Sequence, residues 1–208
     1  DEPNVAAENL NAHVDLEGRR IALTHLEADV NGGRLSGQGN VTLGEGLVSD
    51  VNLDIPTTDF AYDAPLDLRS LTDSDIRINK QEDNFVVGGR VTITEAGMTG
   101  DINFDTGILA AMTARRRLDL TEERNPFLDR VRFDINVNTA TPILVDNNLA
   151  RAETRARLRV VGTPYEPGLV GQLTLLEGGE IRLNARRYEV ERGIITFVDE
   201  RRIFPSFD

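Results

Sequence analysis

The sequence contains no cysteine, so it can form neither a disulfide nor a thiolate metal site. A chain without thiols tolerates an oxidising compartment, which is consistent with the periplasm. Histidine is almost absent too, with only His13 and His25 in the 208 residues. Neither belongs to a His-x-His, His-Glu-x-x-His or serine-triad arrangement. We therefore expect no enzyme, no metal site and no cofactor, and we interpret both histidines as ordinary strand residues.

Aromatic residues and positive charge are also scarce. There is no Trp, and with 3 Tyr and 8 Phe the 39% of hydrophobic residues are mainly aliphatic. This composition suits a sheet with one solvated face better than a thick core. The 35 acidic residues outnumber the 23 basic ones, and the net charge of -12 opposes binding to a phosphate backbone. We therefore expect no nucleic-acid partner.

Long hydrophobic segments are missing as well. No apolar run approaches the roughly 20 residues that a membrane-spanning helix needs. The first residues, Asp1-Glu2-Pro3, do not resemble the basic start of a signal peptide. We expect any membrane anchor to lie outside these residues.

The pattern that is present is a period-two alternation in short segments separated by Gly, Asn and Asp. In Val131–Val137 and in Ala150–Val160, apolar or small residues alternate with charged or amide residues. Such alternation is typical of half-buried antiparallel strands. Further strand candidates are Ile21–Val30, Val41–Leu43, Val51–Ile55, Ile76–Ile78, Val91–Ile93, Ile102–Phe104, Leu169–Leu175, Ile181–Ala185, Tyr188–Val190 and Ile194–Val198. The sequence therefore predicts an all-β fold, a long antiparallel meander.

A short motif occurs three times and supports this prediction. The pattern Gly-x-[Val/Leu]-Thr-[Leu/Ile]-x-Glu-[Gly/Ala] spans Gly39–Gly46, Gly89–Ala96 and Gly171–Gly178. In each copy a glycine opens a candidate strand and a glutamate precedes a turn. The spacing between copies is unequal, which indicates a decayed repeat and not a fixed-period solenoid.

Residues 105–128 lack the alternation. Thr106–Glu123 contains good helix formers and the triplet Arg115-Arg116-Arg117, and Asn125-Pro126 ends the segment. We expect a short helix or a mobile excursion here.

Several polar groups are candidate sites. The acidic pairs Asp73/Asp75 and Glu122/Glu123 lack the aromatic cleft of a glycosidase and the ligand spacing of a calcium loop, so we interpret them as solvated surface. The arginines from Arg151 to Arg159 form either an anion-binding strip or cross-strand ion pairs, and the acidic surplus favours pairing. The same two alternatives apply to Arg115–Arg117, where contact with a lipid headgroup is a stronger candidate than in the strip from Arg151 to Arg159. Gly37-Gln38-Gly39 is interpreted as strand, not as a phosphate loop.

The C-terminal third resembles a known family. The segments that carry the resemblance are Pro142–Leu149, Leu158–Gly171, Gly178–Ile181, Tyr188–Phe197 and Ile203–Pro205. They resemble the C-terminal region of TamB proteins, and Gly32–Leu43 resembles the looser repeat of AsmA-like proteins. On this basis residues 1–208 are expected to form a single elongated β-sheet fragment of a larger TamB-like protein, with repeat-like strands in 1–104 and the most family-like strands in 129–208.

The resemblance implies a Gram-negative protein that is anchored in the inner membrane and extends through the periplasm as a curved sheet with an apolar groove. It also implies a role in phospholipid movement or outer-membrane protein assembly. The implied partners are phospholipid acyl chains and an Omp85-family (TamA-like) outer-membrane barrel, the latter bound through a region beyond residue 208.

The alternation does not determine what covers the apolar face. In a closed sandwich, the two halves of a sheet of a dozen strands cover each other, whereas in an open trough lipid fills the space between them. The scarcity of aromatic residues favours the trough. The functional hypotheses are a lipid conduit, an assembly scaffold that pairs through an edge strand, and, as a distant third, an enzyme acting on surface polysaccharide. The residues predicted to line the trough are Val131, Phe133, Ile135, Val137, Leu158, Val160, Leu173, Leu175, Ile181, Leu183, Tyr188, Val190, Ile195 and Phe197.

Overall fold

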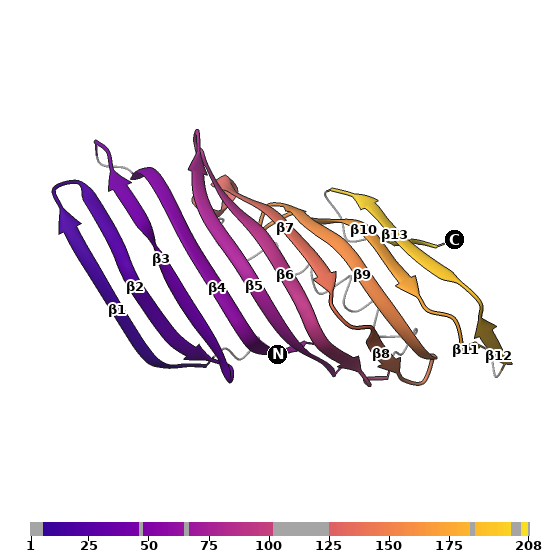
Figure 1. The fold of residues 1–208 in the computed structure, drawn as a ribbon. Helices are drawn as coiled ribbons and strands as arrows, with labels where there is room; N and C mark the ends of the chain where they lie inside the picture. The colour runs from indigo at the N-terminus through magenta and orange to yellow at the C-terminus, as the bar shows by residue number, and fades with distance from the viewer. Residues whose placement is uncertain are drawn as a thin grey trace.

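The computed structural model describes residues 6–45, 48–64, 67–101, 125–183, 186–200 and 205–207, and its strands form one 14-stranded sheet (Figure 1). The strands are β1 (Ala7–Glu17), β2 (Arg20–Val30), β3 (Gly33–Leu43), β4 (Val48–Ala64), β5 (Leu68–Gln81), β6 (Asn84–Met98), β7 (Val131–Thr139), β8 (Ile143–Asp146), β9 (Ala150–Gly162), β10 (Pro167–Leu175), β11 (Gly179–Leu183), β12 (Arg186–Val190), β13 (Gly193–Asp199) and β14 (Pro205–Phe207). Within these ranges the remaining element is a 3₁₀ turn, η1 (Leu128–Arg130). The fold is all-β, as predicted.

The strands follow one another across the sheet from β1 to β6, and the order then continues through β7, β9, β10, β13 and β14. The short strand β8 pairs with β6 and β9, whereas β11 pairs with β9 and β12. In the part of the chain that is described, β1 and β14 pair with one neighbour each, so the sheet is open and not closed into a barrel. No described helix is long and apolar enough to cross a membrane.

The meander is antiparallel except beside β6. Strands β7 and β8 both run parallel to β6. A parallel pair requires the chain to cross back between its two strands, whereas an antiparallel pair needs only a tight turn. The helix or mobile excursion predicted for 105–128 falls mostly on residues 102–124, which lie outside the described residues.

The sheet is a single layer (Figure 1). All of the described strands belong to this one sheet, in which each strand lies beside the neighbours that it hydrogen-bonds. The chain exposes 14670 Å² of surface. A compact monomer of the same mass exposes about 9,600 Å². The closed sandwich weighed from the sequence is not formed.

Register shifts are concentrated in the N-terminal half. They interrupt the pairing of β1 with β2, β2 with β3, β3 with β4, β4 with β5, and β5 with β6. Asp59, with φ 53°, lies in one of these irregularities, between Thr57 and Phe60. Bulges bend a strand and increase its twist. The first six strands can therefore curve without losing their common apolar face.

The three copies of the glycine motif are equivalent in the structure. Gly39, Gly89 and Gly171 have φ values of 151°, 133° and 124°. A Cβ atom at each would overlap the backbone of the neighbouring strand, at Asn52, Asp75 and Arg157 respectively. Only glycine combines this backbone conformation with such a close approach. The motif therefore marks a recurring close approach of β3, β6 and β10 to a neighbouring strand.

Candidate functional site

The apolar face of the sheet is the candidate functional site. Directly paired residues of neighbouring strands lie on the same face of a sheet, so the register shows which residues share it. Val137 pairs with Leu158, and Ile135 with Val160. Leu173 pairs with Ile195 on the other side of β10. Four strands thus place their predicted lining residues on one face.

The remaining predicted positions belong to the same face. Phe197 pairs with Gly171, which in turn pairs with Leu158. Ile181 pairs with both Ala150 and Tyr188, and so connects β11 and β12 to the apolar side of β9. The other positions follow by the two-residue period within their strands: Val131, Phe133, Leu175 and Val190. Leu183 is the last residue of β11. That these residues contact lipid stays a prediction.

The face is more extensive than the sequence analysis proposed. Strands β2 to β6 place further apolar residues on the same face as those of β7: Ile21, Leu23, Leu35, Val41, Val51, Leu53, Ile55, Ile76, Ile78, Phe85, Val87, Val91 and Ile93. Most of these residues had been assigned to candidate strands. The period-two alternation within each strand was the signal that would have placed them on this face.

The best-packed part of the face lies at one end of β4, β6 and β7. Val51, Phe85 and Val131 are each 7–8% exposed and form the buried cluster of this region. The turn that precedes β7 closes over it, because the Phe127 and Phe85 rings lie 5.0 Å apart and the Arg130 guanidinium lies 5.9 Å from the centre of the Phe85 ring. This end of the face is therefore covered by the chain itself.

Elsewhere the face remains accessible. No described side chain is less than 2% exposed. Leu16 at the β1 end is 74% exposed, and Tyr188 at the β12 end is 50% exposed. Exposed contiguous apolar surface in a soluble domain marks a contact site for another molecule. The face is therefore exposed at both ends of the sheet, and residues between them, such as Ile135 and Leu158, are half-buried.

A patch of hydroxyl groups interrupts the apolar face on β4 and β5. Thr57 and Ser74 hydrogen-bond to each other through their hydroxyl oxygens, 2.8 Å apart. The Thr72 and Ser70 hydroxyls donate to the backbone carbonyls of Phe60 and Tyr62. These residues line a shallow hollow of about 320 Å³. Since the hydroxyls bond within the sheet, the hollow remains compatible with an apolar ligand.

The opposite face is polar and carries ion pairs. Arg159 Nε donates to Asp134 Oδ1 at 2.6 Å, and Arg77 Nε donates to Asp54 Oδ1 at 3.0 Å. The hydrogen bond from Arg159 lowers the pKa of Asp134 below its ordinary value, and partial burial opposes this effect only in part. Pairing of the β9 arginines with acids, favoured from the sequence, is found for Arg159 and for Arg151, whose Nε lies 3.6 Å from Asp146 Oδ2.

The groups considered for chemistry also lie on the polar face. His13 and His25, assigned to separate strands from the sequence, pair directly across β1 and β2. Asp73 accepts a hydrogen bond from the Asp59 backbone N–H at 3.0 Å. In the described part of the chain no three His, Cys, Asp or Glu residues form a group suited to a metal ion. Gly37 and Gly39 lie within β3, which confirms their interpretation as strand residues. Glu122, Glu123 and Arg115–Arg117 lie outside the described residues.

Comparison with known proteins assigns the family. No match was found among curated proteins or among solved structures. The family model described as the TamB C-terminal domain matches residues 24–208, which include all of the strands from β3 to β14. The chain therefore belongs to the TamB family, with a general role in outer-membrane assembly or transport in the Gram-negative envelope.

Proposed function

We propose that this chain is a non-enzymatic lipid conduit that holds phospholipid acyl chains along the apolar face of its sheet, in the periplasm. The observation that carries the proposal is an extended apolar face, shared by strands from β2 to β13 and interrupted by the hydroxyl patch on β4 and β5, that no second sheet layer of the described chain covers (Figure 1). Burial of each acyl CH₂ contributes about 0.8 kcal/mol, so a short contact already retains a chain. Because such contacts are non-directional, the lipid can move along the face without any chemical step.

The polar face supports the same proposal. Cross-strand pairs such as Arg159–Asp134 keep that side of the sheet hydrated, so lipid is confined to one face. An inner-membrane anchor and an Omp85-family barrel partner, both outside the described residues, complete the proposed route between the membranes.

The decisive experiment measures bound phospholipid by native mass spectrometry on protein purified gently from bacterial envelopes. The test variant is Ile135→Glu, which places a carboxylate on the apolar face between Gly89 of β6 and Val160 of β9. An unpaired charge in an acyl-filled path costs several kcal/mol, so lipid occupancy should fall sharply. Asn136→Glu is the matched control, because it adds the same charge to the adjacent residue on the polar face.

Melting temperatures of both variants accompany the lipid measurement. A folded Ile135→Glu protein that retains as much lipid as the Asn136→Glu control would contradict the conduit. Lipid loss confined to Ile135→Glu, with both variants folded, would support it.

Edge-strand pairing is the second candidate function, and one observation favours it. All residues of β1 are exposed, and β1 pairs only with β2 in the described structure. Such an edge offers unpaired backbone N–H and C=O groups to an incoming client strand. In that case substitutions on β1 should impair outer-membrane protein assembly while bound lipid stays unchanged.

A further inference from the structure

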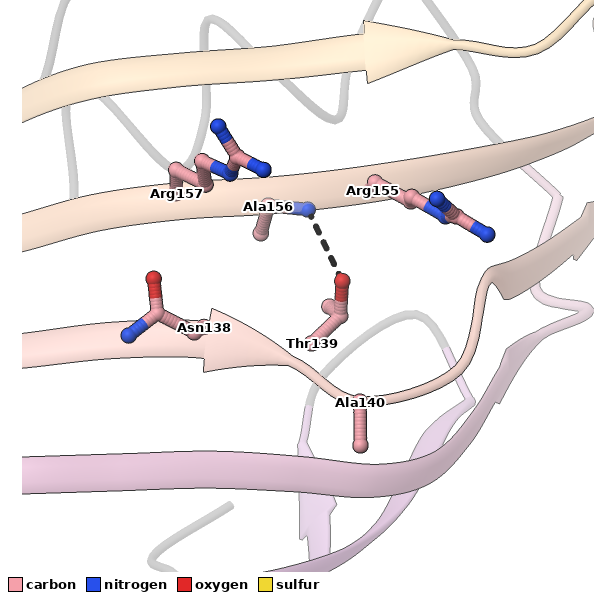
Figure 2. A pocket seen from close by; sticks show the side chains of 6 residues that line it. All are labelled: Asn138, Thr139, Ala140, Arg155, Ala156 and Arg157. Atoms are coloured by element: carbon pink, nitrogen blue, oxygen red, sulfur yellow. Dashed lines mark hydrogen bonds between the residues drawn. The ribbon is translucent and has the colours of Figure 1, made fainter.

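The strand pairing beside β9 contains a gap. Pairing with β7 stops at Asn138 and Arg157, and pairing with β8 starts at Ile143 and Thr154. Between them the Ala156 N–H donates to the Thr139 hydroxyl, at 3.2 Å, in place of a backbone carbonyl. A hollow of about 290 Å³ lies at this gap (Figure 2). Its lining residues are Asn138, Thr139, Ala140, Arg155, Ala156 and Arg157.

The two arginines of this hollow differ from the other arginines of β9. Arg151 and Arg159 each pair with an aspartate on a neighbouring strand. Arg155 and Arg157 form no ion pair or side-chain hydrogen bond with any described residue. Their cross-strand partners are neutral: Asn138 and Gln172 lie opposite Arg157, and Thr174 lies opposite Arg155.

This arrangement is unusual for so acidic a chain. The sequence has 35 acidic residues against 23 basic ones, yet it places two arginines two residues apart on one face without a carboxylate across either strand. Glu153 is the next acidic position along β9, and it forms no ion pair with Arg155. Neighbouring like charges disfavour the sheet unless an anion compensates them.

The chemistry of the hollow matches a phosphate group. Guanidinium groups donate in a planar fork that fits phosphate oxygens. The Arg155 and Arg157 side chains start about 7 Å apart along β9 and extend in different directions (Figure 2), and rotation of these long side chains brings both guanidinium groups onto one anion. The Asn138 side-chain amide lies directly opposite Arg157 and supplies a further donor. We propose that Arg155, Arg157 and Asn138 form a phosphate-binding site on the polar face, at the gap between β7 and β8. The site lies on the opposite face from the lipid conduit and does not depend on it.

The test measures binding of two phosphate sources to the 208-residue chain. One arm titrates inorganic pyrophosphate by calorimetry. The other measures co-sedimentation with phosphatidylglycerol vesicles and with phosphatidylcholine vesicles. The variant Arg155→Gln/Arg157→Gln removes two charges, and Arg20→Gln/Arg90→Gln, on exposed polar-face positions of β2 and β6, is the matched control for net charge.

We expect the Arg155/Arg157 variant to bind at least about tenfold more weakly, and the control to bind like the unaltered protein. Loss in the pyrophosphate arm would identify a soluble phosphate ligand, and loss restricted to phosphatidylglycerol vesicles would identify a lipid headgroup. Absence of binding in both arms, or equal weakening by the control variant, would overturn the proposal.

Discussion

Gly89 illustrates how single residues shape the sheet. Its φ of 133° and the overlap that a Cβ atom would make with the Asp75 carbonyl both exclude a side chain. We expect Gly89→Ala to lower the free energy of unfolding by at least about 2 kcal/mol, through backbone strain and the displacement of β5. Urea denaturation measures the change.

Gly97 is the control for this substitution. It lies on the same strand without a positive φ, and the nearest atom to an added Cβ is 3.9 Å away. Gly97→Ala should therefore leave stability nearly unchanged. Because the loss of glycine flexibility in the unfolded chain favours folding, equal losses of stability for the two variants would show that the positive φ and the close approach at Gly89 do not explain the effect.

The Asp134–Arg159 pair gives a pH prediction. The hydrogen bond from Arg159 holds the pKa of Asp134 below its ordinary value of 3.8, so the pair stabilises the fold above that pH. The contribution disappears as the pH falls through the lowered pKa of the folded state. Both side chains are about half exposed, with relative exposures of 54% and 44%, so the gain at neutral pH is at most about 1 kcal/mol.

The measurement compares the unaltered protein with Asp134→Asn by urea denaturation across this pH range. The stability difference should be present at neutral pH and vanish in acid. Asp50→Asn, at an exposed position of β4 opposite the neutral Thr42 of β3, should show no such trend. A difference for Asp134→Asn that persists in acid would assign the effect to packing instead.

At the scale of the element, β1 combines a free edge with apolar exposure. Leu10, Val14 and Leu16 are 69%, 49% and 74% exposed. An edge strand of this kind favours association between copies. We expect Val14→Lys to reduce self-association, as measured by sedimentation velocity.

His13→Lys is the matched control for the β1 prediction, because residue 13 is adjacent but lies on the polar face. It introduces the same positive charge without removing apolar surface. Equal reduction by the two variants would show that charge repulsion alone is responsible.

The strands that the sequence predicted best are those with strict alternation. Strand β9 alternates between the buried Ala152 and Ala156 and exposed arginines, as its sequence indicates. Strands β5 and β6 extend well beyond the predicted Ile76–Ile78 and Val91–Ile93. Their flanking Ser, Thr and Gly residues give little periodic signal, and pairing with long neighbours extends the strands over them.

The direction and the register of strand pairing could not be predicted from the local sequence pattern. The parallel pairing of β6 with β7 joins segments on either side of residues 102–124, and a period-two pattern does not specify the direction of its partner. Local sequence likewise does not distinguish the arginines of β9 that have an acidic partner from those that have none. Only the register shows that Asp134 and Asp146 lie beside Arg159 and Arg151 but not beside Arg155 or Arg157.

At the scale of the whole molecule, one layer of sheet separates an apolar face from a charged one. A ligand that covers the apolar face of the folded chain, and not of the unfolded chain, stabilises by mass action. At about one hundred times its dissociation constant the gain is about 2.7 kcal/mol, which for a domain of this size raises the melting temperature by roughly 5–10 °C.

Dihexanoyl phosphatidylcholine below its micelle concentration is the suitable ligand, and glycerophosphocholine, which carries the same headgroup without acyl chains, is its control. Because the aliphatic rows from β2 to β13 are the surface to be covered, only the acylated molecule should raise the melting temperature. The Ile135→Glu variant should lose this response, since its carboxylate lies in the middle of the face. Equal shifts with both molecules would place binding on the polar face, and no shift with either would contradict an acyl-chain site.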